Sequence, residues 1–398
     1  MIDNTLIDPF GRVRTSNVKT LFDSKQILDK QPLYWDEAVV SGSGGSFTYN
    51  TDRASTTIGV SANTACRAVR QTLRRFNYQP GKGQLVQMTG VLGNSKTGIT
   101  KRIGYYDDNN GVFFELNANG LCCVVRTKTS GQVVDTKYYQ EDWNENTLEG
   151  GDEKIIVLDT TKTQIFHIDF EWLGVGTVRF GMIFDGVLIY THRIHNANMF
   201  SNVYMSTPNL PARYEIIADG TNTESAILIQ ICTTIGSEGG VDTSGFKFSA
   251  NRGSTAMVTA NNNNIYPVMG IRLKSTHLSS TVKIEGINTI CTSTAAYAWY
   301  LLLNPTITGT ALTYAGVDNT SVEISKTSTN ATTVSGGILL ARGVAQSTND
   351  SSIIVSSPND YTLGSKINGT RDEVILAVQR LTGTAETFYS SITWLDQQ

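Results

Sequence analysis

The stretch from Gln164 to Ile194, QIFHIDFEWLGVGTVRFGMIFDGVLIYTHRI, decides the fold class. It contains three short runs rich in apolar and β-branched residues, 164–173, 177–184 and 187–194, and each has the length and composition of a strand. Only Asp185-Gly186 separates the last two runs, and this dipeptide accepts the positive φ angles of a tight hairpin turn. The stretch therefore predicts neighbouring antiparallel strands.

Similar runs continue on both sides of this stretch. Asn110-Gly111 and Asn119-Gly120 mark two further hairpin turns. The additional predicted strands are 85–92, 101–107, 111–117, 121–127, 132–139, 213–218 and 225–233. Short strands at this spacing, with Gly and Asn at the turns, indicate an antiparallel sandwich or jelly roll.

A second strand-rich block fills the C-terminal part of the chain. The run EVILAVQRL, residues 373–381, fits a strand or a short helix by length alone. Because its neighbours all resemble strands, we predict a strand there. The other predicted strands of this block are 266–274, 280–292, 297–304, 321–326, 336–344, 351–356 and 387–396. They predict a second β-sandwich.

The fold class that we predict is all-β, with two antiparallel β-sandwich or jelly-roll domains and an extended N-terminal arm. The arm has no clean period of 2 or 3.6, and Pro9-Phe10-Gly11 and Gln31-Pro32 interrupt regular structure at its two ends. The predicted boundaries are 1–40 for the arm, 41–235 for a jelly-roll or concanavalin-like sandwich, 236–263 for a linker rich in Gly, Ser, Thr and Asn, and 264–398 for the second sandwich.

Composition excludes several protein classes. Of the 398 residues, 17% are charged and 40% are hydrophobic, and the net charge is −3. This composition argues against a coiled coil, a disordered chain and a dedicated nucleic-acid-binding protein. No apolar run is long enough to cross a membrane as a helix, and we expect no signal peptide. Five cysteines without a CxxC spacing, 66, 122, 123, 232 and 291, predict reduced thiols rather than disulfides or a zinc site.

Three alternating polar residues, His167, Asp169 and Glu171, share one face of the predicted strand. Such a set is typical of the solvated face of a sandwich. The alternative is a catalytic carboxylate pair, Asp169 and Glu171, as in concanavalin-like glycosidases. His192 and His195 have a metal-binding spacing but no partner pattern, so we interpret them as polar residues at a strand end.

The run from Asp107 to Gly111, DDNNG, carries the oxygen ligands that calcium prefers. A tight β-turn explains every residue of it, and its spacing is not that of an EF-hand. The sequence contains no GxSxG, P-loop or GxGxxG opening a helix. We therefore predict no catalytic residues, no metal and no cofactor.

Four long segments resemble a group of tailed-bacteriophage virion structural proteins. They are DPFGRVRTSNVKTLFDSKQILDKQPLYWDE (8–37), IGYYDDNNGVFFELNANGLCCVVRT (103–127), IFHIDFEWLGVGTVRFGMIFDGVLIYTHRIHNAN (165–198) and VYMSTPNLPARYEI (203–216). The resemblance covers roughly residues 8–275 closely and the C-terminal block loosely. It implies a non-enzymatic component of the virion, assembled in the bacterial host cytoplasm, with an anchoring arm and β-sandwich modules. It implies no catalytic residue set.

The arm then becomes the predicted partner-binding site, because it mixes basic and aromatic residues without regular structure. The contact residues that we predict are Phe10, Arg12, Arg14, Leu21 and Phe22. The expected partners are other virion proteins of the capsid, neck or tail, and further copies of the chain, with a trimer suited to a fibre or decoration. The alternative function is a receptor- or glycan-binding module that contacts the host surface. The third candidate function is that of a depolymerase, an enzyme that would use Asp169 and Glu171 as its catalytic carboxylates.

Overall fold

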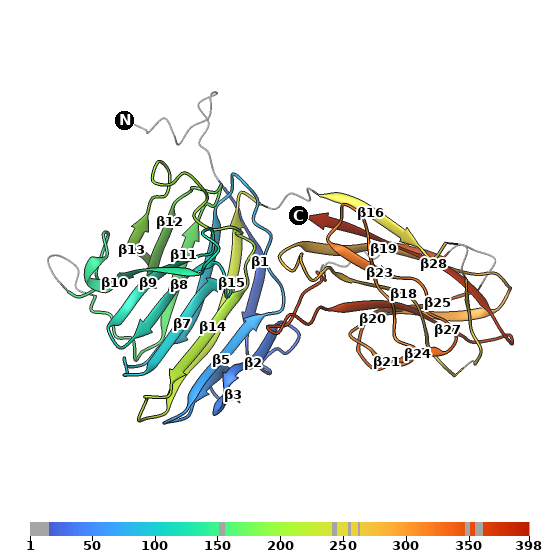
Figure 1. Cartoon of the computed structure of the whole chain (residues 1–398), viewed down its shortest axis with the longest axis horizontal. Coiled ribbons are helices and arrows are strands. Elements are labelled where there is room, and N and C mark those ends of the chain that lie inside the picture. Colours follow the sequence, from blue (N-terminus) through green and yellow to red (C-terminus); the bar gives the residue numbers. More distant parts are fainter. Residues whose placement is uncertain are drawn as a thin grey trace. The chain divides into compact units, whose positions relative to one another are not determined.

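The computed structural model describes residues 16–150, 156–240, 245–253, 256–261, 263–346, 351–354 and 361–397. Strands and turns make up nearly all of this structure, and its helical content within those ranges is a single 3-10 turn at Gln140–Asp142 (Figure 1). The prediction of an all-β chain is confirmed. No described helix is long and apolar enough to cross a membrane.

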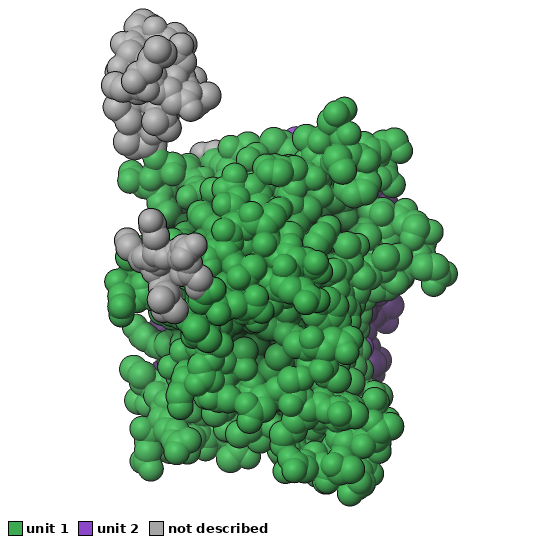
Figure 2. Space-filling view, turned by 90° about the vertical axis from the view of Figure 1, so that its left-hand side faces the viewer, with its two compact units in different colours: residues 1–243 green, residues 244–398 purple. Residues whose placement is uncertain are grey.

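The chain divides into two compact units, residues 1–243 and 244–398, which Figure 2 shows in different colours. The first unit contains two antiparallel sheets. One has the order β13-β12-β11-β6-β15-β4-β3, with β1 also paired to β15. Its strands are β1 (Val18–Lys25), β3 (Gly45–Asn50), β4 (Ser55–Val60), β6 (Gln84–Val91), β11 (Gln164–Phe170), β12 (Val178–Phe184), β13 (Val187–Ile194) and β15 (Ala226–Glu238).

The second sheet of this unit has seven strands in the order β10-β9-β8-β7-β14-β5-β2. They are β2 (Trp35–Gly42), β5 (Ala65–Thr72), β7 (Ile99–Tyr106), β8 (Gly111–Asn117), β9 (Gly120–Thr127), β10 (Val134–Tyr139) and β14 (Ala212–Asp219). A shared core joins the two sheets into a sandwich. Phe114 of the seven-stranded sheet packs on Phe166 of the eight-stranded sheet, with ring centroids 5.1 Å apart.

Alternation decides which side chains enter this core, because successive residues of a strand point to opposite faces of the sheet. On β11, Phe166, Ile168 and Phe170 are buried in the core, while His167 and Asp169 point to the outer face. Cys122 and Cys123 divide in the same way: Cys123 belongs to the core and Cys122 to a smaller cluster on the outer face. All five cysteines are free in the structure, as predicted.

The hairpin predictions have mixed outcomes. Asp185 and Gly186, with φ of 50° and 77°, form the two-residue turn between β12 and β13 as predicted. The turn before β8 is a four-residue loop, in which the Asp107 carboxylate accepts hydrogen bonds from the backbone N–H groups of Asn109 and Asn110. The next turn is formed one residue earlier than predicted, because Asn117 pairs with Gly120 across it.

The second unit contains two larger antiparallel sheets and a two-stranded one. The strand order is β16-β28-β19-β26 in the first, with β17 also paired to β28, and β22-β23-β18-β27-β20-β25 in the second. The strands are β16 (Phe246–Asn251), β17 (Met257–Val258), β18 (Tyr266–Leu273), β19 (Thr281–Cys291), β20 (Ala296–Leu303), β21 (Thr306–Gly309), β22 (Ala315–Gly316), β23 (Val322–Ser325), β24 (Thr332–Ser335), β25 (Ile338–Gln346), β26 (Ser351–Ile354), β27 (Glu373–Arg380) and β28 (Thr387–Gln397).

This unit has its own core. Tyr297 of β20 meets Phe388 of β28 edge to face, with ring centroids 5.1 Å apart, so the core joins its two larger sheets. Trp394 is fully buried in it. The run EVILAVQRL forms the buried strand β27, as predicted.

The predicted arm over residues 1–40 needs correction. Residues 1–15 lie outside the described residues, but β1 pairs with β15 and β2 pairs with β5, so most of residues 18–40 belongs to the first sandwich. Trp35 is 2% exposed and its indole N–H donates to the Ser24 hydroxyl at 2.9 Å. Tertiary pairing with distant strands gives this segment a structure that its irregular hydrophobic pattern does not signal.

The predicted linker over residues 236–263 is also wrong over much of its length. Strand β15 continues to Glu238 in the first unit. Strands β16 and β17 pair with β28 in the second unit, and β16 alternates Phe246 and Phe248 with polar residues. The boundary between units falls between residues 243 and 244.

We expect Phe166→Ala to lower the free energy of unfolding of the full chain by about 3–5 kcal/mol, because it leaves a cavity between the two sheets. The neighbouring variant Ile165→Ala is the control, since Ile165 is 37% exposed on the same strand. It should cost about 1 kcal/mol or less. Urea unfolding followed by tryptophan fluorescence measures both, and equal effects would contradict the assignment of faces on β11.

Candidate functional site

A groove of about 450 Å³ crosses one end of the eight-stranded sheet. The strands are antiparallel, so this end collects the starts of β6 and β12 and the ends of β15, β11 and β13. Its lining is mostly polar and charged. The lining residues are Gly81, Lys82, Gly83, Asp169, Phe170, Glu171, Thr177, Arg179, Arg193, His195 and Glu238.

Asp169 is the most strongly held carboxylate of the groove. Its oxygens accept hydrogen bonds from Arg179 Nε and Tyr190 Oη, both at 2.5 Å, and lie 3.3 Å from His167 Nε2. Burial alone would raise its pKa, but these partners outweigh burial, so the pKa of Asp169 lies below the usual aspartate value. The side chain is therefore an ionised, structurally paired carboxylate at neutral pH.

The structure corrects the prediction of a solvated face at His167, Asp169 and Glu171. His167 and Asp169 are each only 3% exposed, although they point away from the sandwich core. Glu171 follows the end of β11 and is exposed. Asp169 and Glu171 do line the same groove, as the carboxylate-pair alternative requires.

Glycoside hydrolysis by such a pair needs one carboxylic acid that stays protonated near neutral pH, which requires a raised pKa. Asp169 has the opposite shift. Among the described carboxylates, every resolved pKa shift is downward. The hydrogen bonds from Arg179 and Tyr190 therefore favour the ionised form of Asp169, which is the opposite of what a proton donor requires.

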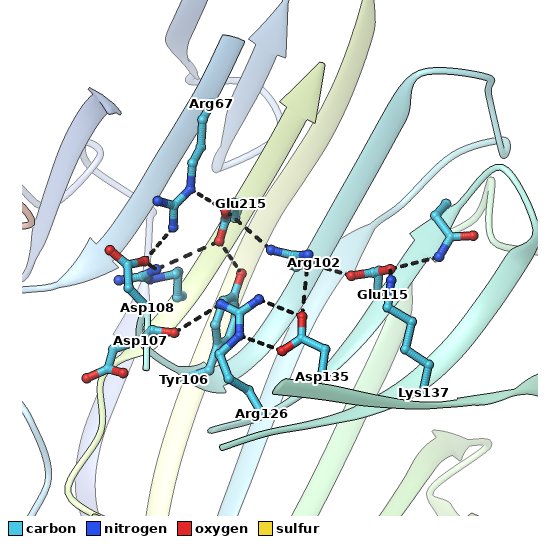
Figure 3. Close-up of polar contacts among 12 residues, drawn as sticks. Arg67, Arg102, Tyr106, Asp107, Asp108, Glu115, Arg126, Asp135, Lys137 and Glu215 are labelled. Atoms are coloured by element: carbon cyan, nitrogen blue, oxygen red, sulfur yellow. Dashed lines mark hydrogen bonds and ion pairs between the residues drawn. The ribbon is translucent and has the colours of Figure 1, made fainter. Parts of the chain in front are cut away.

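A second polar cluster covers the outer face of the seven-stranded sheet (Figure 3). Strand register sets it up, because Arg102 on β7 lies opposite Glu215 on β14 and Glu115 on β8. Arg102 Nε is 2.7 Å from Glu115, and its guanidinium is 3.6 Å from Glu215. Further out, Arg126 binds Asp135 through two hydrogen bonds of 2.8 Å.

Glu215 is the centre of this cluster and is fully buried. Its carboxylate is 2.6 Å from Arg67 Nε and accepts a 3.0 Å hydrogen bond from the Tyr106 hydroxyl. Burial would raise the pKa of Glu215, but Arg102, Arg213 and Arg67 outweigh burial and lower it. The charges stay buried because they compensate one another and because Tyr106 packs on Phe113, with ring centroids 4.3 Å apart.

A hollow of about 290 Å³ lies at one end of the same sheet. The half-buried Tyr139 lines this hollow. Its hydroxyl is 3.3 Å from the Asn117 side-chain amide nitrogen and 3.5 Å from the Asn119 side-chain amide nitrogen. Asp219 and Lys137 also line it. An aromatic ring beside amides and a carboxylate provides both a stacking surface and hydrogen-bonding groups.

The other predicted motifs are local structure. His192 Nδ1 accepts a hydrogen bond from the Asn144 backbone N–H at 3.3 Å, and His195 Nδ1 lies 3.4 Å from the Thr177 hydroxyl. The two histidines thus have separate partners. Asp107 supports its own turn and is paired with Arg75 at 2.6 Å. Within the described ranges, no group of three or more His, Cys, Asp or Glu side chains is placed to hold a metal ion.

The predicted partner-binding residues fall into two sets. Phe10, Arg12 and Arg14 lie outside the described residues. Phe22 is 6% exposed and belongs to the sandwich core, and the partly buried Leu21 packs against the same core.

Exposed apolar residues in the β1–β2 region were missed by the sequence prediction. Leu28 is 87% exposed, the highest value among the large hydrophobic residues with a described exposure. The others in this region are Val18, Ile27, Leu33, Tyr34, Val39 and Val40. The segment QILDKQPLY carries the signal, since its apolar residues match no strand or helix period.

No family model and no curated protein matches this chain. Solved structures similar to part of it include the carbohydrate recognition domain of Emp47p, at 9% identity over 56% of this chain and 97% of that chain, with a TM-score of 0.35. A β-glucanase from Bacillus licheniformis is similar at 11% identity over 57% and 99%, with a TM-score of 0.33. A legume lectin-like domain from Entamoeba histolytica is similar at 7% identity over 55% and 98%, also with 0.33. These similarities are too distant to bear on activity or ligand.

We expect Glu215→Gln to destabilise the chain by about 3–5 kcal/mol at pH 7, because it leaves buried arginines without their counter-charge. The pKa of Glu215 is lowered in the folded state, so its contribution is present above the unfolded-state pKa of about 4.3 and is lost as the pH falls through the folded value. Urea unfolding at several pH values between about 7 and 3 measures this dependence.

The variant should therefore lose less stability on acidification than the unmodified chain. The exposed Glu224→Gln is the control and should leave stability nearly unchanged at pH 7. An identical pH dependence in the unmodified chain and in Glu215→Gln would show that Glu215 does not carry the acid sensitivity.

Proposed function

We propose that this chain is a non-enzymatic structural protein of a tailed-bacteriophage virion, attached to the capsid, neck or tail through the N-terminal part of its first unit. The long segments that resemble virion structural proteins support the assignment to a particle. The lowered pKa of Asp169 supports a non-catalytic role, because an acid catalyst needs a carboxyl group whose pKa is raised.

The observation that carries the attachment proposal is the concentration of exposed apolar side chains between residues 27 and 40. Leu28, Leu33 and Ile27 are 87%, 56% and 61% exposed, and they lie in one loop between β1 and β2. Exposed apolar residues gathered in one place mark interaction sites on folded proteins. In the sequence, the basic segment with Arg12 and Arg14 precedes β1 and this loop follows β1, and we propose that both take part in attachment.

The loop is rigid enough to act as a preformed contact. Arg70 is fully buried beneath it, donates hydrogen bonds to the Lys30 carbonyl and to Glu37, and lies over the Trp35 ring at 5.3 Å. A surface fixed in this way loses little conformational entropy on binding. The partner that it fits is another protein of the particle with an apolar recess.

We expect two changes to prevent incorporation into particles without unfolding the chain: deletion of residues 2–15, and Leu28→Asp combined with Leu33→Asp. The deletion ends before β1, because β1 pairs with β15 and is part of the eight-stranded sheet. Complementation of a phage lacking the gene, followed by mass spectrometry of purified particles, measures copy number.

The control for the aspartate variant is Val187→Asp, at a residue that is 60% exposed in the hairpin far along the sequence. It should incorporate normally. Normal incorporation of both test variants would refute attachment through this region, and absence of the unmodified chain from purified particles would refute the virion assignment itself.

Glycan binding is a second candidate function, favoured by the hollow at Tyr139. Saccharides bind where an aromatic face lies beside hydrogen-bonding groups, and Tyr139 with Asn117, Asn119 and Asp219 supplies that combination. In a virion component, such a site would contact a polysaccharide of the host surface.

We expect Tyr139→Ala to abolish binding to any host surface glycan that a glycan array identifies for the unmodified chain, with at least a tenfold loss measured by calorimetry. Val134→Ala is the matched control, because Val134 is exposed on the same strand and does not line the hollow. No bound glycan on the array, or equal affinity for Tyr139→Ala, would exclude this site.

A further inference from the structure

The outer face of the eight-stranded sheet has a polar end and an apolar end. The polar end lies at the groove, where Asp169 is bound by Arg179 and Tyr190. Gln87 and His167, whose side-chain nitrogens are 3.3 Å apart, continue this polar region. The opposite end, which we call the aliphatic face, carries large side chains from β11, β12, β13 and β15: Ile165, Ile183, Leu188, Ile227, Ile229 and Ile231. We propose that the aliphatic face binds the same face of a second copy of the chain.

Alternation along the strands turns these side chains away from the sandwich core. Phe166 of β11 belongs to the core, so the neighbouring Ile165 points to the outer face. Leu228 of β15 also belongs to the core, so Ile227 and Ile229 on either side of it point outward. Ile165 is 37% exposed and Ile227 is 52% exposed. The aliphatic face is therefore open to solvent in the single chain.

Strand pairing makes the aliphatic face continuous across the sheet. Leu188 of β13 pairs with Ile183 of β12, and the register between β12 and β11 places Ile165 beside Ile183. Ile165 in turn pairs with Thr89 of β6, and β6 lies beside β15. The face thus extends from β13 to β15 as one surface.

The positions between the aliphatic side chains are small and uncharged. They include Thr57, Gly59, Thr89 and Gly181 on β4, β6 and β12. A Cβ atom on Gly181 would lie 3.1 Å from Leu188 Cδ1, so the leucine leans over this glycine. Charged residues are depleted at the cores of protein interfaces, as they are on this face. Two copies of one uncharged surface, with isoleucine ridges beside glycine and threonine hollows, can fit each other, as a two-fold interface requires.

The size of the aliphatic face is that of a small interface core. The five steps from β13 to β4 span about 24 Å, and the distance along β15 from Ile227 to Ile231 is about 13 Å. With the polar rim that normally surrounds an interface core, such a core fits a total buried area of about 1,200 Å². This area is near the lower limit for specific complexes, so we expect a dissociation constant on the order of 10 μM.

A two-fold axis parallel to β6 fits the layout of the face. Ile165 of β11 lies on one side of β6, opposite Thr89. On the other side, Gln230 of β15 pairs with Gly90, which puts Ile231 close to the level of Thr89. Rotation about this axis lays β15 of one copy over β11 of the other, so that Ile231 meets the partner's Ile165. The two sheets then pack face to face with nearly aligned strands, as sheets do in β-sandwiches.

Sedimentation velocity of the purified full-length chain over a wide range of concentrations tests this inference, which does not depend on the virion proposal. We expect the fraction of dimer to increase with concentration. Ile165→Asp combined with Ile227→Asp should weaken dimerisation at least tenfold, because it buries carboxylates between two apolar faces. The matched control is Val134→Asp combined with Val344→Asp, at residues that are 46% and 75% exposed on β10 and β25, and it should leave dimerisation unchanged.

Circular dichroism and urea unfolding identify any variant that fails to fold. A chain that stays monomeric at every concentration overturns the proposal. A dimer that the folded double aspartate variant leaves intact also overturns it, because that dimer would use another surface. The proposal is likewise overturned if the chain is monomeric and the double variant is lost from phage particles, since another protein of the particle would then cover this face.

An exchange of charges tests the two-fold arrangement directly. Ile165→Lys and Ile231→Asp should each weaken dimerisation, because each homodimer then places two charges against isoleucine. A mixture of the two variants should form a heterodimer at least tenfold more tightly than either variant alone, since lysine meets aspartate at one contact and isoleucine meets isoleucine at the other. A mixture that dimerises no better than the separate variants contradicts the proposed pairing of β15 with the partner's β11.

Discussion

The first unit depends on the mutual burial of two antiparallel sheets. Neither sheet is stable alone, because each has one face of large apolar side chains, and contacts such as that between Phe114 and Phe166 remove both faces from water at once. This requirement fixes the alternation along every strand. It therefore also decides which polar side chains are left on the outer faces, and those residues form both the groove and the ion-pair cluster.

The outer face of the seven-stranded sheet shows what happens when such polar residues are not left to water. Glu215 and Glu115 are fully buried there, and each is surrounded by basic side chains from neighbouring strands. Removal of one charged side chain leaves the opposite charges of its partners without compensation, so the ion pairs of the cluster depend on one another. It ties together β5, β7, β8, β9, β10 and β14 by specific pairs, which fixes their register more firmly than apolar packing alone.

Much of this fold could be predicted from local sequence, and the failures have physical causes. Asp185-Gly186 predicts its hairpin because the turn is determined by the two residues that form it. Strands β1 and β2 could not be predicted in this way, because distant pairing stabilises them and their own pattern is irregular. For the site, alternation shows that His167 and Asp169 share a face, but their burial depends on Arg179 and Tyr190 from other strands. The exposed Leu28 and the ion pairs of Glu215 likewise depend on tertiary contacts.

The pairing of β1 with β15 has a consequence for synthesis of the chain. Val18 is made early, yet its partner Glu238 emerges from the ribosome only after almost the whole first unit has been translated. The second unit repeats this arrangement, because its first strand, β16, pairs with its last, β28. In each unit the first strand finds its hydrogen-bonding partner only when the last strand has been made. The sheet that contains both strands therefore cannot be completed until the whole unit has been translated. A ribosome that stalls shortly before residue 226 would present a sandwich with an open seam between β4 and β6.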